Sequence, residues 1–185
     1  MTGTIRGVAA GAAIAVLAAC GAATQQGAEG ARPRGYTVPV YNANSQQVAS
    51  FTVTQVSADS IRLVVESTGL PAGTHGTHLH AVGRCDAPQF TTAGAHLNPT
   101  SRQHGLRNPQ GPHLGDMPNL TVGANGQGRM ETIVRGSLTP GRAPLFDADG
   151  TSLVVHASAD DQVTDPAGNS GARIACGLLA SPTAG

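Results

Sequence analysis

The chain has 185 residues, with 11 basic and 11 acidic side chains, and therefore a formal net charge of zero at pH 7. This balance argues against nucleic-acid binding, which needs a basic face. Once the N-terminal segment described next is set aside, the length fits one domain with a sizeable core, and no further apolar run is long enough to cross a membrane.

Residues 1–19 have the pattern of a secretory signal peptide. One early charge, Arg6, precedes a run of Ala, Gly, Val and Ile that is too short to span a bilayer. The run ends in Leu17-Ala-Ala-Cys20, which resembles the bacterial lipobox, in which the cysteine is lipidated and becomes the new N-terminus. The alternative is an ordinary signal peptide cut at a small-residue site. We favour the lipobox, because Cys20 follows the apolar run directly.

Residues 20–35 are small, polar and rich in glycine, which is typical of a flexible linker, and we expect the folded domain to cover residues 36–185. A lipid on Cys20 would attach the protein to a membrane without spanning it. We therefore expect the periplasmic side of a bacterial cell envelope as the location. Gly21 stands where an aspartate is associated with inner-membrane retention, so the outer membrane is favoured.

The pattern of the domain is that of a β protein. Short segments with alternating or branched apolar residues predict strands at 36–41, 49–54, 60–66, 79–82, 130–134 and 153–157. Clusters of Gly, Pro, Asn and Asp separate them, and no stretch has a convincing helical period. These features favour an antiparallel sandwich or barrel. The long segment 86–118 has little strand character, and a loop of that length is uncommon unless something such as a metal holds it.

Two cysteines remain if Cys20 carries a lipid. Cys85 and Cys176 would then form one long-range disulfide in the oxidising compartment that an exported protein meets. The alternative, that they are metal ligands, is weaker because they lie far apart and the chain contains no Cys-x-x-Cys motif.

Six of the seven histidines occur in a pattern that suits metal binding. His78 and His80 are two residues apart, so on a strand both point to the same face and reach one ion together. His156 could join them if its strand is a neighbour. In the long loop, three histidines and a carboxylate have the composition of a closed zinc site: His96, His104, His113 and Asp116.

These residues amount to seven ligands, whereas two four-coordinate metals need eight. One imidazole that bridges both metals through its two ring nitrogens would complete the number, provided that it is deprotonated. The remaining histidine, His75, lies outside the set, and we interpret it as structural or exposed.

The sequence resembles the exported bacterial type of copper/zinc superoxide dismutase over nearly all of the domain. Five segments carry the resemblance, in the order of the family: Gly73-Thr-His-Gly-Thr-His-Leu-His80, Gly94-Ala-His-Leu-Asn-Pro99, Gly111-Pro-His-Leu-Gly-Asp116, Val154-Val-His156 and Gly168-Asn-Ser-Gly-Ala-Arg-Ile-Ala-Cys-Gly177. The resemblance implies a Greek-key β-barrel or sandwich of about eight antiparallel strands with long metal-binding loops. Cys85 and Cys176 match the intramolecular disulfide of the family.

The resemblance also implies a role for each ligand. Copper is expected on His78, His80, His96 and His156. Zinc is expected on His96, His104, His113 and Asp116, so that His96 is the bridge. Asp160 matches an outer carboxylate that links a copper histidine to a zinc histidine, here His78 and His104. Arg173 matches an arginine beside the copper that attracts and orients superoxide.

The implied activity is the conversion of superoxide to oxygen and hydrogen peroxide, with one copper and one zinc per subunit, which would protect the cell envelope. The resemblance implies that copper is the redox metal, that His96 leaves it and takes up a proton in one half of the cycle, and that zinc orders the loop and tunes His96. Superoxide is the expected partner, and both a monomer and a homodimer remain open.

Two other functions remain as alternatives. One is a non-enzymatic lipoprotein that buffers copper or zinc, and the other is a copper-only dismutase, which should lack the zinc histidines. Two features differ from the family pattern. Ala81 follows His80 where Glu is frequent. The loops also lack a pronounced lysine cluster, so we expect weaker electrostatic guidance of superoxide beyond that of Arg173.

Overall fold

The structure is a computed structural model, and it describes residues 1–3, 35–138, 145, 147 and 149–179. Cys20 and nearly all of the expected signal peptide and linker, 1–19 and 20–35, lie outside the described residues. In the part of the chain that is described, no helix is both long and apolar enough to cross a membrane.

Nine strands are present among the described residues, and all of their pairings are antiparallel. Their bounds are β1 (Gly35–Asn42), β2 (Gln47–Ser57), β3 (Ser60–Ser67), β4 (Gly73–His75), β5 (Thr77–His80), β6 (Leu120–Val122), β7 (Gly128–Arg135), β8 (Thr151–His156) and β9 (Arg173–Leu179). All six predicted strands exist, although β5 ends at His80 rather than Val82. The strands β4, β6 and β9 were not predicted.

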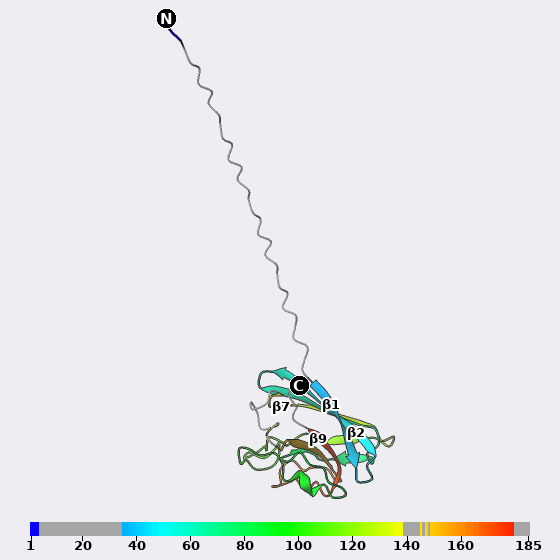
Figure 1. Cartoon of the computed structure of the whole chain (residues 1–185). Helices are drawn as coiled ribbons and strands as arrows, with labels where there is room; N and C mark the ends of the chain where they lie inside the picture. The colour runs from blue at the N-terminus through cyan, green and yellow to red at the C-terminus, as the bar shows by residue number, and fades with distance from the viewer. Residues whose placement is uncertain (4–34, 139–144, 146, 148, 180–185) are drawn as a thin grey trace. The chain divides into compact units, whose positions relative to one another are not determined.

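The strands form a nearly closed barrel, as Figure 1 shows. Their order is β4-β6-β7-β3-β2-β1-β9-β8-β5, so β4 and β5 are the two edges, and Gly76 alone separates them in sequence. At Gly76 the chain changes neighbours, because its N–H donates to Ser158 and its carbonyl accepts from the His156 N–H. A Cβ on Gly76 would lie 2.8 Å from the Ser170 Cβ, so only glycine fits this junction. If β4 and β5 are taken as one interrupted strand, the expected barrel of about eight strands is confirmed.

Two connections cross the barrel in the Greek-key manner. The chain passes from β3 to β4 and from β7 to β8 without joining neighbouring strands. The first crossing leads into β5 and the second into β8, and these two strands pair with each other. The crossovers therefore bring His78, His80 and His156 together from distant parts of the sequence.

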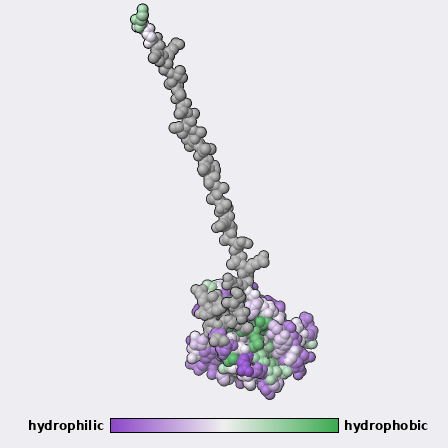
Figure 2. Space-filling view, in the orientation of Figure 1, coloured by the Kyte–Doolittle hydropathy of each residue, from purple (hydrophilic) through white to green (hydrophobic). Residues whose placement is uncertain are grey.

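The interior is built from the alternating apolar residues of β2 and β3, such as Phe51, Val53, Ile61 and Leu63, all fully buried. Strand β8 is buried on both faces. Leu153 and Val155 join the main core, whereas Val154 packs in a second cluster with Phe90, Ala93 and Cys176 under the loops. This double burial explains the uninterrupted apolar run of β8. The surface seen in Figure 2 is mostly hydrophilic, with a hydrophobic area near its centre.

The long segment between β5 and β6 contains no strand, as expected, and gathers on one side of the barrel (Figure 1). It holds one 3-10 turn, Thr91–Ala93, and two isolated bridges, His80 with His96 and His78 with Asp116. The predicted disulfide is present: Cys85 in this segment bonds Cys176 on β9, with Cα atoms 5.7 Å apart and a separation of 91 positions in sequence. Such a link stabilises a fold by roughly 2–4 kcal/mol.

Candidate metal centre

Four buried histidines converge where β5 and β8 meet the long loop. Ligand atoms of His78, His80, His96 and His156 all lie within 4.8 Å of one another. His78 and His80 come from β5, and His156 ends the neighbouring strand β8. His96 is brought to them by the isolated bridge to His80. We call these four residues the four-histidine group.

In each ring of this group, one nitrogen contacts a partner that holds the ring in place, and the other nitrogen has no hydrogen-bond partner. Gly94 accepts from His80 Nδ1 at 2.9 Å, Gly171 from His156 Nδ1 at 3.1 Å, and a carboxylate from His78 Nε2. The unpartnered buried nitrogens include His78 Nδ1, His80 Nε2, His96 Nε2 and His156 Nε2. Buried polar atoms are almost always satisfied, so four unpartnered nitrogens that converge fit a metal ion with imidazole ligands.

A second group surrounds one oxygen of Asp116. Its Oδ1 lies 3.1 Å from His96 Nδ1, 3.0 Å from His104 Nδ1 and 3.3 Å from His113 Nδ1. His113 Nδ1 is also 3.4 Å from His96 Nδ1. Ligands about 2.0–2.1 Å from a central ion, at the corners of a tetrahedron, are separated by roughly 3.3–3.4 Å. The spacing of this group, which we call the Asp116 group, fits one zinc ion.

His78 also lies close to the Asp116 group. Its ring stacks on His96 with centroids 3.9 Å apart, and its ligand atoms are within 4.8 Å of those of His96, His104 and Asp116. The outer nitrogen of His78 is occupied by Asp160 at 2.7 Å. The free nitrogen, Nδ1, therefore belongs with the four-histidine group, and the fourth member of the Asp116 group is His113.

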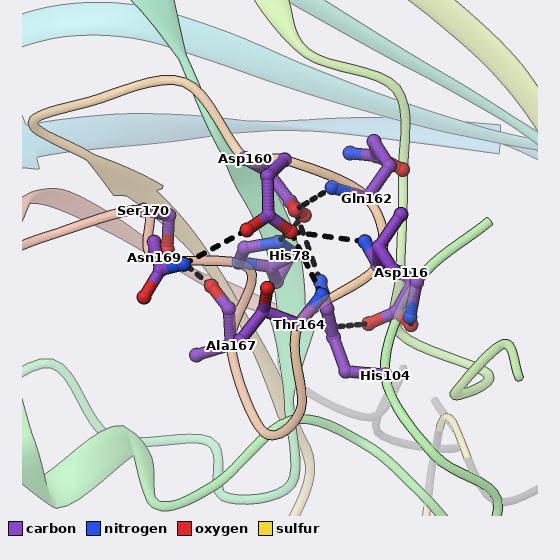
Figure 3. Close-up of polar contacts among 12 residues, drawn as sticks. His78, His104, Asp116, Asp160, Gln162, Thr164, Ala167, Asn169 and Ser170 are labelled. Carbon is purple, nitrogen blue, oxygen red and sulfur yellow. Dashed lines mark hydrogen bonds and ion pairs between the residues drawn. The ribbon is translucent and has the colours of Figure 1, made fainter. Parts of the chain in front are cut away.

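Asp160 links one histidine of each group, and Figure 3 shows its side chain near His78 and His104. Its Oδ2 accepts from His78 Nε2 at 2.7 Å and its Oδ1 accepts from His104 Nε2 at 3.0 Å. Asn119 holds the Asp160 backbone from both sides, accepting from its N–H and donating to its carbonyl. A Cβ on Gly168 would overlap the Asp160 carboxylate, so a glycine with φ 59° is required beside it.

Burial decides the protonation of the four-histidine group. It lowers the pKa of His80 to about 2, of His156 to about 3 and of His96 to about 4, and neighbouring histidines add to the effect for each. Burial lowers the pKa of His78 as well, although Asp160 opposes it. These rings are therefore neutral, which is the form whose lone pair binds a metal.

The electrostatics of the Asp116 group differ, because carboxylates lie among its members. Burial alone would lower the pKa of His104, but hydrogen bonds to Asp116 and Asp160 outweigh it and raise the pKa to about 9. Burial would raise the pKa of both carboxyl groups, but hydrogen bonds from the histidines hold each pKa below its usual range. Both carboxylates therefore stay negative, as a cation site requires.

Arg173, the first residue of β9, lies beside the four-histidine group. Its guanidinium donates to the carbonyls of Phe90 at 2.7 Å and Gly94 at 2.6 Å, and Gly94 also accepts from His80. The side chain is partly buried, which lowers its pKa without removing its charge. Burial is the main cause of the lowered pKa of His80 and of His156, and the Arg173 charge lowers both further, as do neighbouring histidines.

The structure thus brings every predicted ligand into one of two groups, and it resolves the position of His75. His75 is buried rather than exposed, and its ring nitrogens lie 2.8 Å from the His156 carbonyl and 2.9 Å from the Pro71 carbonyl. Asn119 was missed by the sequence, because its contacts are to backbone atoms and carry no signature of residue type.

Known proteins of one family are similar to this chain. The family model described as copper/zinc superoxide dismutase matches residues 47–179. A Cu-Zn superoxide dismutase of Caulobacter vibrioides is 39% identical over 147 residues, which are 77% of this chain and 84% of the relative. A Cu-Zn superoxide dismutase of Aquifex aeolicus is 36% identical over 147 residues, which are 76% and 84% of the two chains.

Solved structures are similar in fold. A SOD-like protein from Bacillus subtilis aligns with a TM-score of 0.69 at 36% identity, covering 77% of this chain and 97% of that chain. The Cu/Zn superoxide dismutase from Brucella abortus aligns with a TM-score of 0.59 at 27% identity, covering 79% and 99%.

Proposed function

This chain belongs to the copper/zinc superoxide dismutase family and is a superoxide dismutase that uses copper and zinc, and on that premise we propose that one imidazole, His96, serves both metals. Copper is bound by His78, His80, His96 and His156. Zinc is bound by His96, His104, His113 and Asp116. The observation that carries the proposal is the position of the two nitrogens of His96: Nε2 is buried and unpartnered among the four histidines, and Nδ1 lies 3.1 Å from Asp116 Oδ1.

The metals and the two nitrogens of His96 have separate roles in the proposed reaction. Copper, when bound, supplies the one-electron oxidation and reduction of superoxide, whereas zinc has no accessible second oxidation state. His96 Nε2 would take up a proton in one half of the cycle and return it in the other, where the reduced superoxide would take its second proton from water and leave as hydrogen peroxide. His96 Nδ1 stays in the Asp116 group throughout, which keeps the ring in position.

Charge and orientation come from Arg173 and Asp160. The Arg173 guanidinium is a fixed positive charge beside the four-histidine group, which attracts and orients a small anion. Asp160 orients His78 and His104 through their outer nitrogens, and so links the two groups.

The mature protein is proposed to act in the bacterial cell envelope, held by a lipid on Cys20, where it removes superoxide from the periplasmic side. The Cys85–Cys176 disulfide supports an oxidising compartment. In cells fed a labelled fatty acid, the full chain should incorporate label and Cys20→Ala should not. Label in Cys20→Ala would contradict the anchor.

The decisive experiment loads the mature protein with copper and zinc and follows superoxide decay. We expect one copper and one zinc per chain, and activity that needs copper. Protein carrying zinc alone is the control. Tight binding of both metals without faster decay would favour the buffering alternative.

His156→Ala tests the copper assignment. Because His156 belongs to the four-histidine group and not to the Asp116 group, the variant should lose turnover and keep its zinc. Metal content and superoxide decay are measured on one sample. Retained activity would contradict the assignment, and loss of both metals would mean that His156 serves the fold instead.

A further inference from the structure

Asp165 is a third carboxylate at the metal centre, and it lies in the loop that joins β8 to β9. Its Oδ1 accepts a hydrogen bond from the backbone N–H of His104 at 2.6 Å. The same oxygen lies 3.7 Å from His113 Nε2. One carboxylate oxygen therefore faces two residues of the Asp116 group, one through the backbone and one through the ring.

The His113 ring is oriented so that its two nitrogens face different carboxylates, Nδ1 toward Asp116 and Nε2 toward Asp165. Nδ1 of His113 points into the Asp116 group, 3.3 Å from Asp116 Oδ1 and 3.4 Å from His96 Nδ1. When Nδ1 binds a metal, a neutral imidazole carries its hydrogen on Nε2, which is the nitrogen that faces Asp165. A carboxylate at the outer nitrogen fixes the tautomer and the orientation of a ligating histidine.

The outer nitrogens of the other two histidines in the Asp116 group face other residues. His104 Nε2 donates to Asp160, and His96 Nε2 lies in the four-histidine group. Among the described residues, Asp165 is the carboxylate that His113 Nε2 faces. Asp165 thus faces the outer nitrogen of His113 at 3.7 Å, a longer contact than the 3.0 Å hydrogen bond of His104 to Asp160.

We propose that Asp165 is a positioning residue for the zinc site. It joins the β8–β9 loop to the β5–β6 loop and slows the loss of zinc. This inference rests on the proposed assignment of His113 to zinc. The Asp165 side chain is 49% exposed, whereas that of Asp160 is fully buried, so water screens it and its effect is the smaller of the two. Loss of an outer partner of a metal ligand costs about 10–100-fold in affinity, and Asp165 belongs at the lower end.

The test is Asp165→Asn in the full mature protein loaded with copper and zinc. Asparagine keeps an oxygen for the His104 N–H and removes the charge that faces His113. We expect zinc to pass to a chromogenic chelator about 10-fold faster than from the wild type, with copper retained. Asp161→Asn is the matched control, because Asp161 lies in the same loop, accepts from Val163, Thr164 and Asn169, and contacts neither group.

A second measurement distinguishes orientation of the ring from general tightening of the loop. In the zinc protein with reduced copper, the Nε2 proton of His113 is followed by NMR. Its exchange with water should be faster in Asp165→Asn and unchanged in Asp161→Asn. Zinc release at the wild-type rate in Asp165→Asn, or equal acceleration in both variants, would overturn the inference.

His113→Ala separates this inference from the assignment beneath it. If His113→Ala loses zinc while Asp165→Asn holds it as the wild type does, only the role of Asp165 fails. If His113→Ala binds zinc as tightly as the wild type, the zinc assignment itself fails.

Discussion

At the scale of single residues, the chemistry depends on which nitrogen of each ring is already engaged. Gly94 and Gly171 occupy Nδ1 of His80 and His156, so both rings present Nε2 to the centre, whereas Asp160 occupies Nε2 of His78 and that ring presents Nδ1. A sequence identifies the histidines but not the backbone carbonyls that select the nitrogen. The convergence of these histidines was therefore predictable, and the nitrogen that each presents to the centre was not.

Arg173 carries a prediction at this scale. The Arg173 guanidinium is a fixed charge beside the four-histidine group. Arg173→Ala should therefore lower the rate constant for superoxide decay by about 10-fold and make that rate constant less dependent on salt concentration. Stopped-flow decay at several ionic strengths measures both. Arg173→Lys is the control that keeps the charge, and it should retain more of the rate. A wild-type rate in Arg173→Ala at low salt would contradict the role.

At the scale of elements, regular alternation was the reliable signal. Strands β2 and β3 were foreseen because their apolar residues alternate along one buried face. Strands β4 and β6 have only three residues each, too few for a period, and β9 contains Cys176 and Gly177, which break one. The long loop was foreseen as irregular, but nothing in its composition indicated the two bridges that tie it to β5.

The long loop should depend on the metals for its order. Between β5 and β6 the described residues form no strand, and the loop supplies all four members of the Asp116 group. Removal of zinc and copper should therefore speed amide hydrogen exchange in residues 99–118 and leave β2 and β3 protected. Metal at 100 times its dissociation constant should raise the free energy of unfolding by about 2.7 kcal/mol. Equal exchange in the two forms would contradict this dependence.

At the scale of the whole molecule, a nearly closed barrel carries two loops that contact each other at its wall. The β5–β6 loop provides the Asp116 group, and the β8–β9 loop provides the carboxylates that orient it. The disulfide joins the β5–β6 loop to β9 of the barrel, and hydrogen bonds join the two loops to each other, including that from the Arg107 N–H to the Gln162 carbonyl at 3.0 Å. The barrel and the gathering of the candidate ligands were predictable from motifs in order, but these contacts between loops depend on tertiary structure and left no pattern in the sequence.

The central claim is that His96 joins the two metals, and magnetic coupling tests it most directly. Cobalt(II) is placed in the zinc position of the copper(II) protein, and the copper EPR signal is recorded at low temperature beside that of the copper-only protein. If the His96 imidazolate bridges the ions, their spins couple and the copper signal disappears, while the copper-only control keeps it. A full copper signal in the copper–cobalt protein would contradict a shared His96.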